Sequence, residues 1–532
     1  MSIGVLIARH PNASSFASDF LPPADKLLAD LENWGNFPVS SRIRAAVSEM
    51  FDSSLFRSQA DVPFYIDVIS DSKSTIKRPT VFIPGYITSG LEVWESLPCA
   101  KAKFRERIWG TASMVKLLIT DAKCWVQHML LAPVNDGKAV HYTDPAGVRI
   151  RAATGLGAAD YLIGDYWVWS PIIEALGYAG YDETKMSMMS YDWRLSLRDL
   201  EHRSKYFSRL KLEIDKLFAI NNKEPVLIIT HSFGSKVWFF FMQWVSHHFT
   251  PQWLDTHVAV VYNIAPVLLG LPKAISALLS GDTRDTAQMG ALSSLVDALI
   301  PPVDRIALTS SWGSIFDMRP IGGSKIWTEP LVYLETNNSL PLALSAESSI
   351  DLLMKTDSMA AQALHQKSSR HGQLRCPPTD SISACYKDEW TDPLNAPLPL
   401  ITRMQIWAVY GIGIPTEIGY NYTLSSDFSD NSGYKINTTH SDADQVINGV
   451  RLGDGDGTVP IQSLRLVPKI FWNHSSLNPG NLTVNVRELE HGETYSVFAR
   501  SSSVGGSSVD HVDIMGNRHV IRDILHLGLG LD

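Results

Sequence analysis

Short apolar runs alternate with longer amphipathic segments from about residue 79 onward. Six runs have strand length, at residues 81–83, 186–191, 226–229, 258–262, 404–410 and 482–486. Between the second and third runs, segment 200–220 places apolar residues at helical spacing, which predicts one crossover helix. A strand, a helix and a further strand in this order predict a parallel α/β sheet.

The run before residue 230 leads directly into a tight turn. Residues 230–234 have the sequence Thr-His-Ser-Phe-Gly, and the apolar segment 236–244 that follows predicts a buried helix. A strand, a turn and a helix in succession would raise the Ser232 hydroxyl above the sheet as a nucleophile elbow. Thr230 departs from the G-x-S-x-G pattern, and an ordinary strand-to-helix turn is the alternative.

Candidates for an acid and a base follow Ser232 in the order typical of α/β-hydrolases. The glycine-rich segment 453–460 contains Asp454 and Asp456, either of which could be the acid or a turn-forming residue. His511 lies in a Ser/Gly-rich loop before an apolar helical run, where a base can reach the nucleophile. The other histidines after the acid are His491, His519 and His526, and the last two fall inside that run.

An oxyanion hole requires backbone N–H groups from the residue after the nucleophile and from an earlier loop. Phe233 is the first candidate. The run 81–83 ends in a Pro-Gly turn that offers Tyr86, with Ile87 as a one-residue alternative. An ordinary turn is the competing interpretation. Asp192 and Arg194 are interpreted as a buried structural pair.

Composition narrows the class of protein. The 532 residues are 45% apolar with a net charge of −9, which supports a large core and disfavours nucleic acid as a partner. No apolar run reaches 18 residues, so we expect no membrane-spanning segment. The cysteine spacings fit no zinc pattern, and neither a metal nor a cofactor is expected.

Cysteines and glycosylation sequons favour a secretory lumen. The four cysteines form two sequence-local pairs, Cys99 with Cys124 and Cys376 with Cys385, which would allow two small disulfide loops. N-x-S/T sequons occur at Asn12, Asn337, Asn421, Asn437, Asn473 and Asn481. The N-terminus is a poor signal peptide, which conflicts with this interpretation.

Two excursions interrupt the alternation of strands and helices. Residues 94–125, here called the lid, interleave Trp94, Trp109 and Trp125 with basic residues, as at a lipid–water boundary. The alternative is a surface loop whose tryptophans belong to the core. Residues from about 265 to 400, here called the cap, are expected to cover the active site, and a surface excursion is the alternative. Residues 1–75 form a peripheral segment, and residues 76–532 form the catalytic domain.

Long segments resemble the phospholipid:diacylglycerol acyltransferases, which belong with lecithin:cholesterol acyltransferase and lysosomal phospholipase A2. The matching segments are 90–95 (GLEVWE), 97–100 (LPCA), 104–110 (FRERIWG), 124–129 (CWVQHM), 144–151 (DPAGVRIR), 155–161 (GLGAADY), 191–196 (YDWRLS), 410–417 (YGIGIPTE) and 511–517 (HVDIMGN). The resemblance covers roughly residues 79–275 and 388–525. Family members usually carry an N-terminal transmembrane anchor, which is absent here, and Ile418 replaces a frequent arginine.

The resemblance implies an α/β-hydrolase fold with a cap and a lid closed by the Cys99–Cys124 disulfide. It places the triad on Ser232, Asp456 and His511, which selects Asp456 over Asp454. It implies acyl transfer without acyl-CoA, from a phospholipid donor to a diacylglycerol acceptor, by a membrane-associated enzyme on the lumenal side of the endoplasmic reticulum. The products would be triacylglycerol and lysophospholipid, formed through an acyl-serine.

Three alternatives to this function stay open. Water can attack the acyl-serine in place of an alcohol, which would give a phospholipase A. A sterol or another lipid alcohol could be the acceptor. An inactive lipid-binding relative is the non-enzymatic alternative.

Overall fold

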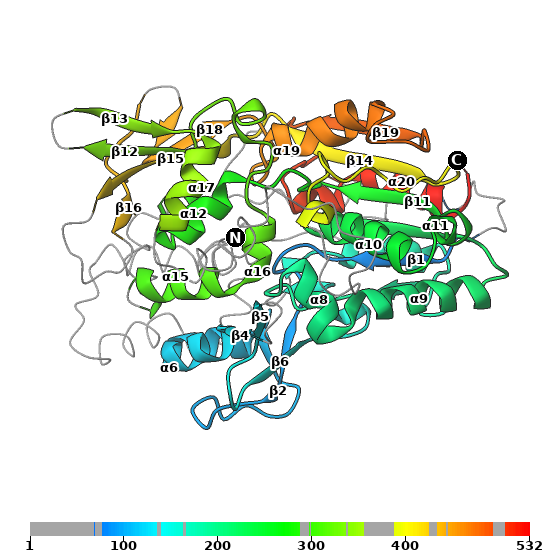
Figure 1. The fold of residues 1–532 in the computed structure, drawn as a ribbon. Helices are drawn as coiled ribbons and strands as arrows, with labels where there is room; N and C mark the ends of the chain where they lie inside the picture. Colours follow the sequence, from blue (N-terminus) through cyan, green and yellow to red (C-terminus); the bar gives the residue numbers. More distant parts are fainter. Residues whose placement is uncertain are drawn as a thin grey trace.

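Six parallel strands form the central sheet of the computed structural model (Figure 1). In spatial order they are β9 (Met186–Met188), β1 (Thr80–Ile83), β10 (Val226–His231), β11 (Val258–Ile264), β14 (Gln405–Ile412) and β19 (Val484–Glu490). Each strand overlaps one of the six predicted apolar runs, so the predicted parallel sheet is confirmed. All six residues of β10 are buried, as expected for a strand covered on both faces.

The structure describes most of the chain from residue 77 onward, with several gaps. The described residues are 77–135, 140–162, 166–287, 299–336, 339–355, 388–424, 433–442, 445–492 and 506–531, together with Ile69 and Asp297. Apart from Ile69, the predicted peripheral segment 1–75 lies outside them, as do Cys376, Cys385, Asn12 and Asn337.

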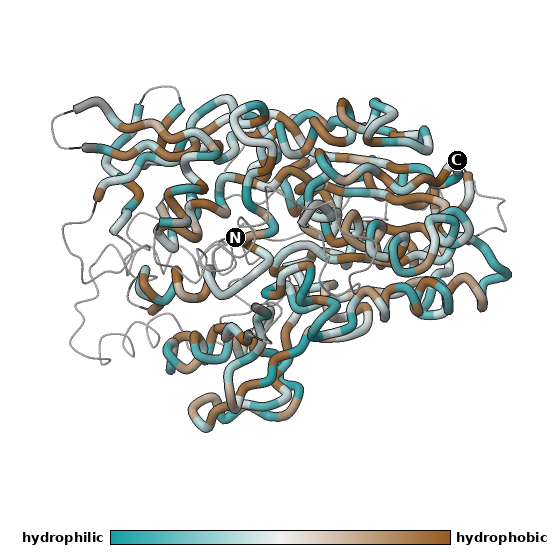
Figure 2. Tube along the Cα trace, viewed as in Figure 1, coloured by the Kyte–Doolittle hydropathy of each residue, from teal (hydrophilic) through white to brown (hydrophobic). Residues whose placement is uncertain are grey.

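Helices cover both faces of the sheet (Figure 1). The helices α9 (Tyr206–Ile220), α10 (Gly234–His248) and α11 (Pro251–His257) lie in front of it, and α20 (Arg518–Gly528) lies behind it and packs against α7 (Ser170–Tyr178). The predicted crossover helix 200–220 is present as α9, but it begins later than predicted, and residues 200–204 belong to a separate helix. Lys205 adopts a left-handed conformation with φ 49° and separates α8 (Leu197–Ser204) from α9. In Figure 2 hydrophobic residues follow the strands and the inner faces of these helices.

A second sheet lies beside the central one (Figure 1). Its strands are β12 (Val332–Thr336), β13 (Ser339–Leu344), β15 (Thr416–Leu424), β16 (Tyr434–Ile436), β17 (Val446–Ile447) and β18 (Val450–Gly453). It thus joins part of the predicted cap to residues beyond β14. Helices from the cap accompany it, namely α12 (Pro272–Ser280), α13 (Arg284–Ala287), α15 (Pro302–Ser311), α16 (Gly313–Asp317) and α17 (Ala346–Lys355). The sequence did not predict this sheet.

The lid extends away from the central sheet, at the bottom of Figure 1. Strands β2 (Leu91–Glu95), β3 (Arg107–Trp109) and β6 (Arg149–Ala152) form a small antiparallel sheet, followed in the chain after β3 by α6 (Ala112–Met129). The predicted disulfide between Cys99 and Cys124 is present. The remaining short elements are β4 (Ala132–Asn135), β5 (Val140–Thr143), β7 (Tyr161–Leu162), β8 (Tyr166–Trp167) and α19 (Ile461–Arg465).

The three lid tryptophans occupy different environments. Trp94 is 42% exposed and packs edge-on against Phe104, which is 68% exposed. Trp109 and Trp125 are buried, and their indole N–H groups donate to the carbonyls of Ile87 and Ile108. The structure therefore contradicts the prediction of lipid contact for Trp109 and Trp125, because both rings pack in the core. Trp94 keeps the exposure that such a contact requires.

Asp192 and Arg194 form an ion pair in the core. Arg194 is fully buried, and its guanidinium donates to both carboxylate oxygens of Asp192, at 2.9 and 2.7 Å. The predicted structural pair is therefore confirmed. Among the described residues no helix combines the length and the apolar character that a membrane span requires.

Candidate active site

Ser232 occupies a sharp turn between β10 and α10. The strand ends at His231, the helix begins at Gly234, and Ser232 itself has φ 54°. A left-handed conformation is uncommon for a residue with a side chain and marks a locally strained backbone. This is the geometry of a nucleophile elbow, in which the hydroxyl is presented at the carboxyl end of the sheet.

Two glycines allow this turn to pack closely. A Cβ at Gly234 would meet the carbonyl oxygens of Ile83 and Pro84, the latter at 2.6 Å, so only glycine lets the start of α10 approach β1. A Cβ at Gly85 would lie 3.0 Å from that of Ser232.

Thr230, at the first position of the motif, bonds to the neighbouring strand of the sheet. Thr230 is fully buried, and its hydroxyl donates to the Asn263 side-chain carbonyl of β11 at 2.8 Å. The side chain therefore bonds to the neighbouring strand, which explains why threonine is accepted where the pattern has glycine.

The three predicted triad residues lie together although they are far apart in sequence. The Ser232 hydroxyl lies 2.8 Å from His511 Nε2, and His511 Nδ1 lies 2.7 Å from Asp456 Oδ2. The other oxygen of Asp456 accepts the N–H groups of Thr458 and Val459, at 3.0 and 2.7 Å. All three triad side chains are buried or nearly so. This arrangement lets His511 take the serine proton while Asp456 orients the ring.

The competing acid and bases have other positions. Asp454 Oδ1 accepts the Gly413 N–H at 2.7 Å, so this carboxylate braces a backbone turn. His519 and His526 lie within α20, as their sequence positions suggested. The N–H of His491 donates to the carbonyl of Ile412 at the end of β14.

His231 also supports the site, and the sequence analysis did not single it out. Its ring Nε2 donates to the His511 carbonyl at 2.8 Å, while the His511 N–H donates to the Asp456 carbonyl at 2.9 Å. Burial above all, together with the nearby His511 ring, lowers the pKa of His231 to about 3. The imidazole is therefore neutral, and it holds the loop that carries the base. Because His231 directly precedes Ser232 in the sequence, its position could have indicated a role at the site.

The proposed oxyanion donors lie beside the nucleophile. Phe233 precedes the first residue of α10, where backbone N–H groups have no partner within the helix. Within the part of the chain that the structure describes, neither the Phe233 nor the Tyr86 N–H donates a hydrogen bond. Ile87 has φ 58°, and its carbonyl accepts from Trp109. The assignment of Phe233 and Tyr86 stays a prediction.

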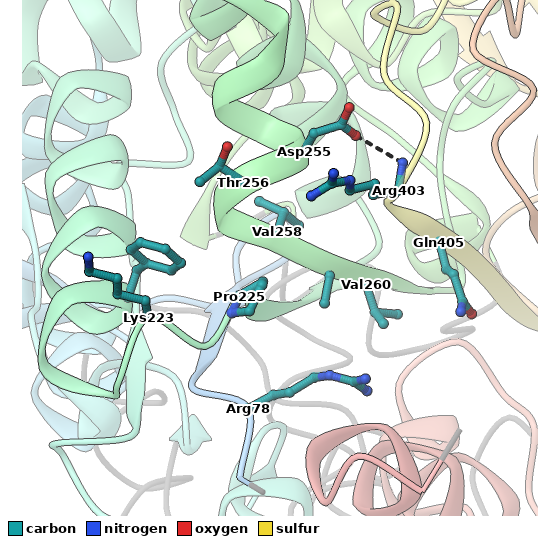
Figure 3. Close-up of a pocket in the computed structure, with 11 residues that line it drawn as sticks. Arg78, Lys223, Pro225, Asp255, Thr256, Val258, Val260, Arg403 and Gln405 are labelled. Atoms are coloured by element: carbon teal, nitrogen blue, oxygen red, sulfur yellow. Dashed lines mark hydrogen bonds between the residues drawn. The ribbon is translucent and has the colours of Figure 1, made fainter.

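A hollow of about 340 Å³ lies at the amino ends of the strands of the central sheet (Figure 3). Pro225, Val258 and Gln405 line it at the amino ends of their strands, and Asp255 accepts the Arg403 N–H there at 2.9 Å. Ser232 follows the carboxyl end of β10, and the strands are parallel. This hollow is therefore separate from the triad.

Two groups of potential metal ligands occur among the described residues. In the first group, Cys99 and Cys124 form a disulfide, which leaves His128 without thiolate partners. In the second group, which also contains Asp199, the rings of His141 and His202 stack 3.6 Å apart with an interplanar angle of 2°. Stacked parallel rings direct their nitrogen lone pairs side by side and not toward a shared ion. Neither group contacts the triad.

The central parallel sheet, the strained serine turn and the Ser–His–Asp hydrogen bonds define the chain as an α/β-hydrolase-fold protein with a serine-type site. Residues 103–518 match the family model described as "Lecithin:cholesterol acyltransferase". The chain therefore belongs to the lecithin:cholesterol acyltransferase family.

Three relatives illustrate the range of similarity. The phospholipid:diacylglycerol acyltransferase of Schizosaccharomyces pombe is 32% identical, over 94% of this chain and 82% of the relative. That of Saccharomyces cerevisiae is 29% identical, over 87% of this chain and 72% of the relative. The lysosomal phospholipase A and acyltransferase of Bos taurus is 23% identical, over 44% of this chain and 57% of the relative.

Proposed function

We propose that this chain transfers a fatty acyl group from a phospholipid to diacylglycerol through an acyl-serine on Ser232. The observation that carries the proposal is the unbroken series of hydrogen bonds from Ser232 through His511 to Asp456. The chain that contains it is similar over most of its length to two acyltransferases named for this reaction.

In the first half-reaction Ser232 Oγ attacks the ester carbonyl carbon of the phospholipid. His511 Nε2 takes the hydroxyl proton, and Asp456 stabilises the resulting imidazolium. The N–H groups of Phe233 and Tyr86 hold the negative oxygen of the tetrahedral intermediate. The bond from the carbonyl carbon to the glycerol oxygen then breaks. That oxygen receives the proton from His511, and lysophospholipid leaves.

In the second half-reaction the diacylglycerol hydroxyl attacks the acyl-serine. His511 takes the hydroxyl proton, and the bond from the acyl carbon to Ser232 Oγ breaks. The proton then passes from His511 to Ser232 Oγ, and triacylglycerol leaves. Water competes with diacylglycerol for the acyl-serine, so transfer requires that water be kept out of the site at this step. We assign this exclusion to the cap, about residues 265–400.

The lid supplies the membrane contact in this proposal. Trp94 and Phe104 form an exposed aromatic pair, and Lys101, Lys103 and Arg105 around them are also exposed. Aromatic rings favour the headgroup level of a bilayer, and cations favour lipid phosphate.

We place the enzyme on the lumenal side of the endoplasmic reticulum. The Cys99–Cys124 disulfide supports an oxidising compartment. The sequon residues Asn473 and Asn481 are exposed and accessible to glycosylation. Asn421 is only 2% exposed, so its sequon would not accept a glycan in the folded protein.

A labelled-phospholipid assay on vesicles tests the reaction. With diacylglycerol present, we expect triacylglycerol and lysophospholipid in roughly equal amounts without acyl-CoA, and neither product from Ser232→Ala. If labelled free fatty acid predominates even with excess diacylglycerol, the phospholipase alternative replaces the transferase. That second candidate is favoured by the similarity to a relative named as a phospholipase A and acyltransferase.

A further inference from the structure

Segment 411–417 braces the loop that carries Asp456. Three hydrogen bonds join the two: Gly413 N–H to Asp454 Oδ1 at 2.7 Å, Ile414 N–H to the Gly455 carbonyl at 3.1 Å, and Gly457 N–H to Thr416 Oγ1 at 2.8 Å. The segment runs from the last two residues of β14 to the first two residues of β15, at the carboxyl end of β14. No residue of the motif 410–417 takes part in the catalytic steps, and its position beside Asp456 gives it a structural role instead.

Of these three hydrogen bonds, the one to the Thr416 hydroxyl involves the residue next to Asp456. It accepts the N–H of Gly457, the residue directly after Asp456, and donates to the Ile414 carbonyl at 2.8 Å. Thr416 is fully buried, and its bond to the Ile414 carbonyl is buried as well, while its bond to Gly457 is partly buried. A Cβ at Gly455 would lie 2.6 Å from Thr416 Oγ1, which shows how closely the loop fits around the hydroxyl.

The next residue ties this support to the cap. Glu417 is buried, and its carboxylate accepts the Arg284 N–H at 2.9 Å and the Tyr420 hydroxyl at 3.1 Å. Lys273 Nζ of α12 lies 3.5 Å from the same carboxylate. Thr416 is therefore held between the acid loop on one side and the start of α12 and α13 on the other.

We infer that Thr416 is a positioning residue that fixes the Asp456 carboxylate against His511. The inference rests on the proposed function for the role of Asp456 as the catalytic acid. The Thr416 hydroxyl bonds to the backbone N–H of Gly457, next to Asp456, so it acts on the direction of the acid loop. Loss of the acceptor leaves the partly buried N–H of Gly457 without its partner, and the loop shifts to recover one. A misplacement of about 1 Å in a catalytic constellation lowers turnover about 100-fold.

Thr416→Val tests the inference, because valine keeps the shape and removes the hydroxyl. Thr416→Ser restores the hydroxyl, and Thr423→Val is the matched control. Thr423 lies on the same strand, and its hydroxyl donates to the Lys435 carbonyl at 3.4 Å, at the end of β15 that pairs with β16. The substrate is a soluble short-chain ester, which requires neither lid nor acceptor. The readouts are kcat, KM, burst amplitude and the rate of labelling by a fluorophosphonate.

For Thr416→Val we expect kcat and the labelling rate to fall about 10- to 100-fold, with unchanged KM and burst amplitude. Thr416→Ser and Thr423→Val should stay within about twofold of the parent protein. If Thr416→Val does not fold, Thr416→Ala serves in the same comparison. Parent-like kcat in a folded Thr416→Val or Thr416→Ala, or loss of burst amplitude alone, overturns the inference. Failure of the parent protein to be labelled would instead refute the proposed function.

Discussion

Acidification should destabilise this protein through His231, the buried neutral imidazole before the nucleophile. Burial is the largest cause that lowers its pKa from 6.5 to about 3, although its hydrogen bond to the His511 carbonyl acts in the opposite direction. Between pH 6.5 and about pH 3, His231 is protonated in the unfolded chain and neutral in the folded chain. Stability is therefore complete above the unfolded pKa and is lost as pH falls toward the folded one. Between pH 7 and pH 5 the loss from this one group is about 2 kcal/mol.

His231→Gln isolates this contribution, because glutamine does not titrate and its amide can still donate to the His511 carbonyl. Urea unfolding at both pH values gives the change in free energy of unfolding for each protein. All other titrating groups are shared, so the parent should lose about 2 kcal/mol more than the variant on acidification. Equal losses in the two proteins would show that His231 is not held neutral by the fold, and the argument from burial would fail.

Four further outcomes follow from the geometry. Ser232→Ala should abolish fluorophosphonate labelling while the unfolding midpoint stays within experimental error. Gly234→Ala should destabilise the protein by about 1–3 kcal/mol in thermal unfolding, because the new Cβ overlaps the carbonyl oxygens of Ile83 and Pro84. Joint replacement of Cys99 and Cys124 by serine opens a loop with sequence separation 25, and denaturant unfolding should show a loss of about 3.5 kcal/mol. Trp94→Ala should reduce activity on vesicles several-fold more than activity on a soluble ester; equal reductions would contradict the lid assignment.

The parallel strands were predictable because both of their faces are buried, so each appears as a short continuous apolar run. The second sheet was not predictable by this route. It pairs Val332 with Tyr420 and Val450 with Tyr420, contacts that join distant parts of the chain. Its strands are also irregular, with register shifts between Leu334 and Thr336. A local pattern carries no information about such pairings.

The lid tryptophans show a related limit of sequence reasoning. Trp94 and Trp109 lie on adjacent antiparallel strands, at β2 and at the end of β3. Trp94 faces outward beside Phe104, while Trp109 packs on Trp193 with ring centroids 4.9 Å apart. Which way each ring points depends on the strand pairing and on the core beneath it. The composition of the segment is the same for both interpretations, so exposure had to come from the structure.

The choice of Asp456 as the proposed catalytic acid depends on residues that are distant in sequence, although the sequence alone reduces the candidates to two. Asp454 and Asp456 lie in one glycine-rich turn, and the turn alone assigns neither. The structure separates them through segment 411–417, since Asp454 accepts the Gly413 N–H while Thr416 holds the residue after Asp456. Asp456 is thereby directed to His511. A change at Thr416 should consequently alter turnover although its hydroxyl bonds to Gly457 and Ile414 and not to a triad side chain.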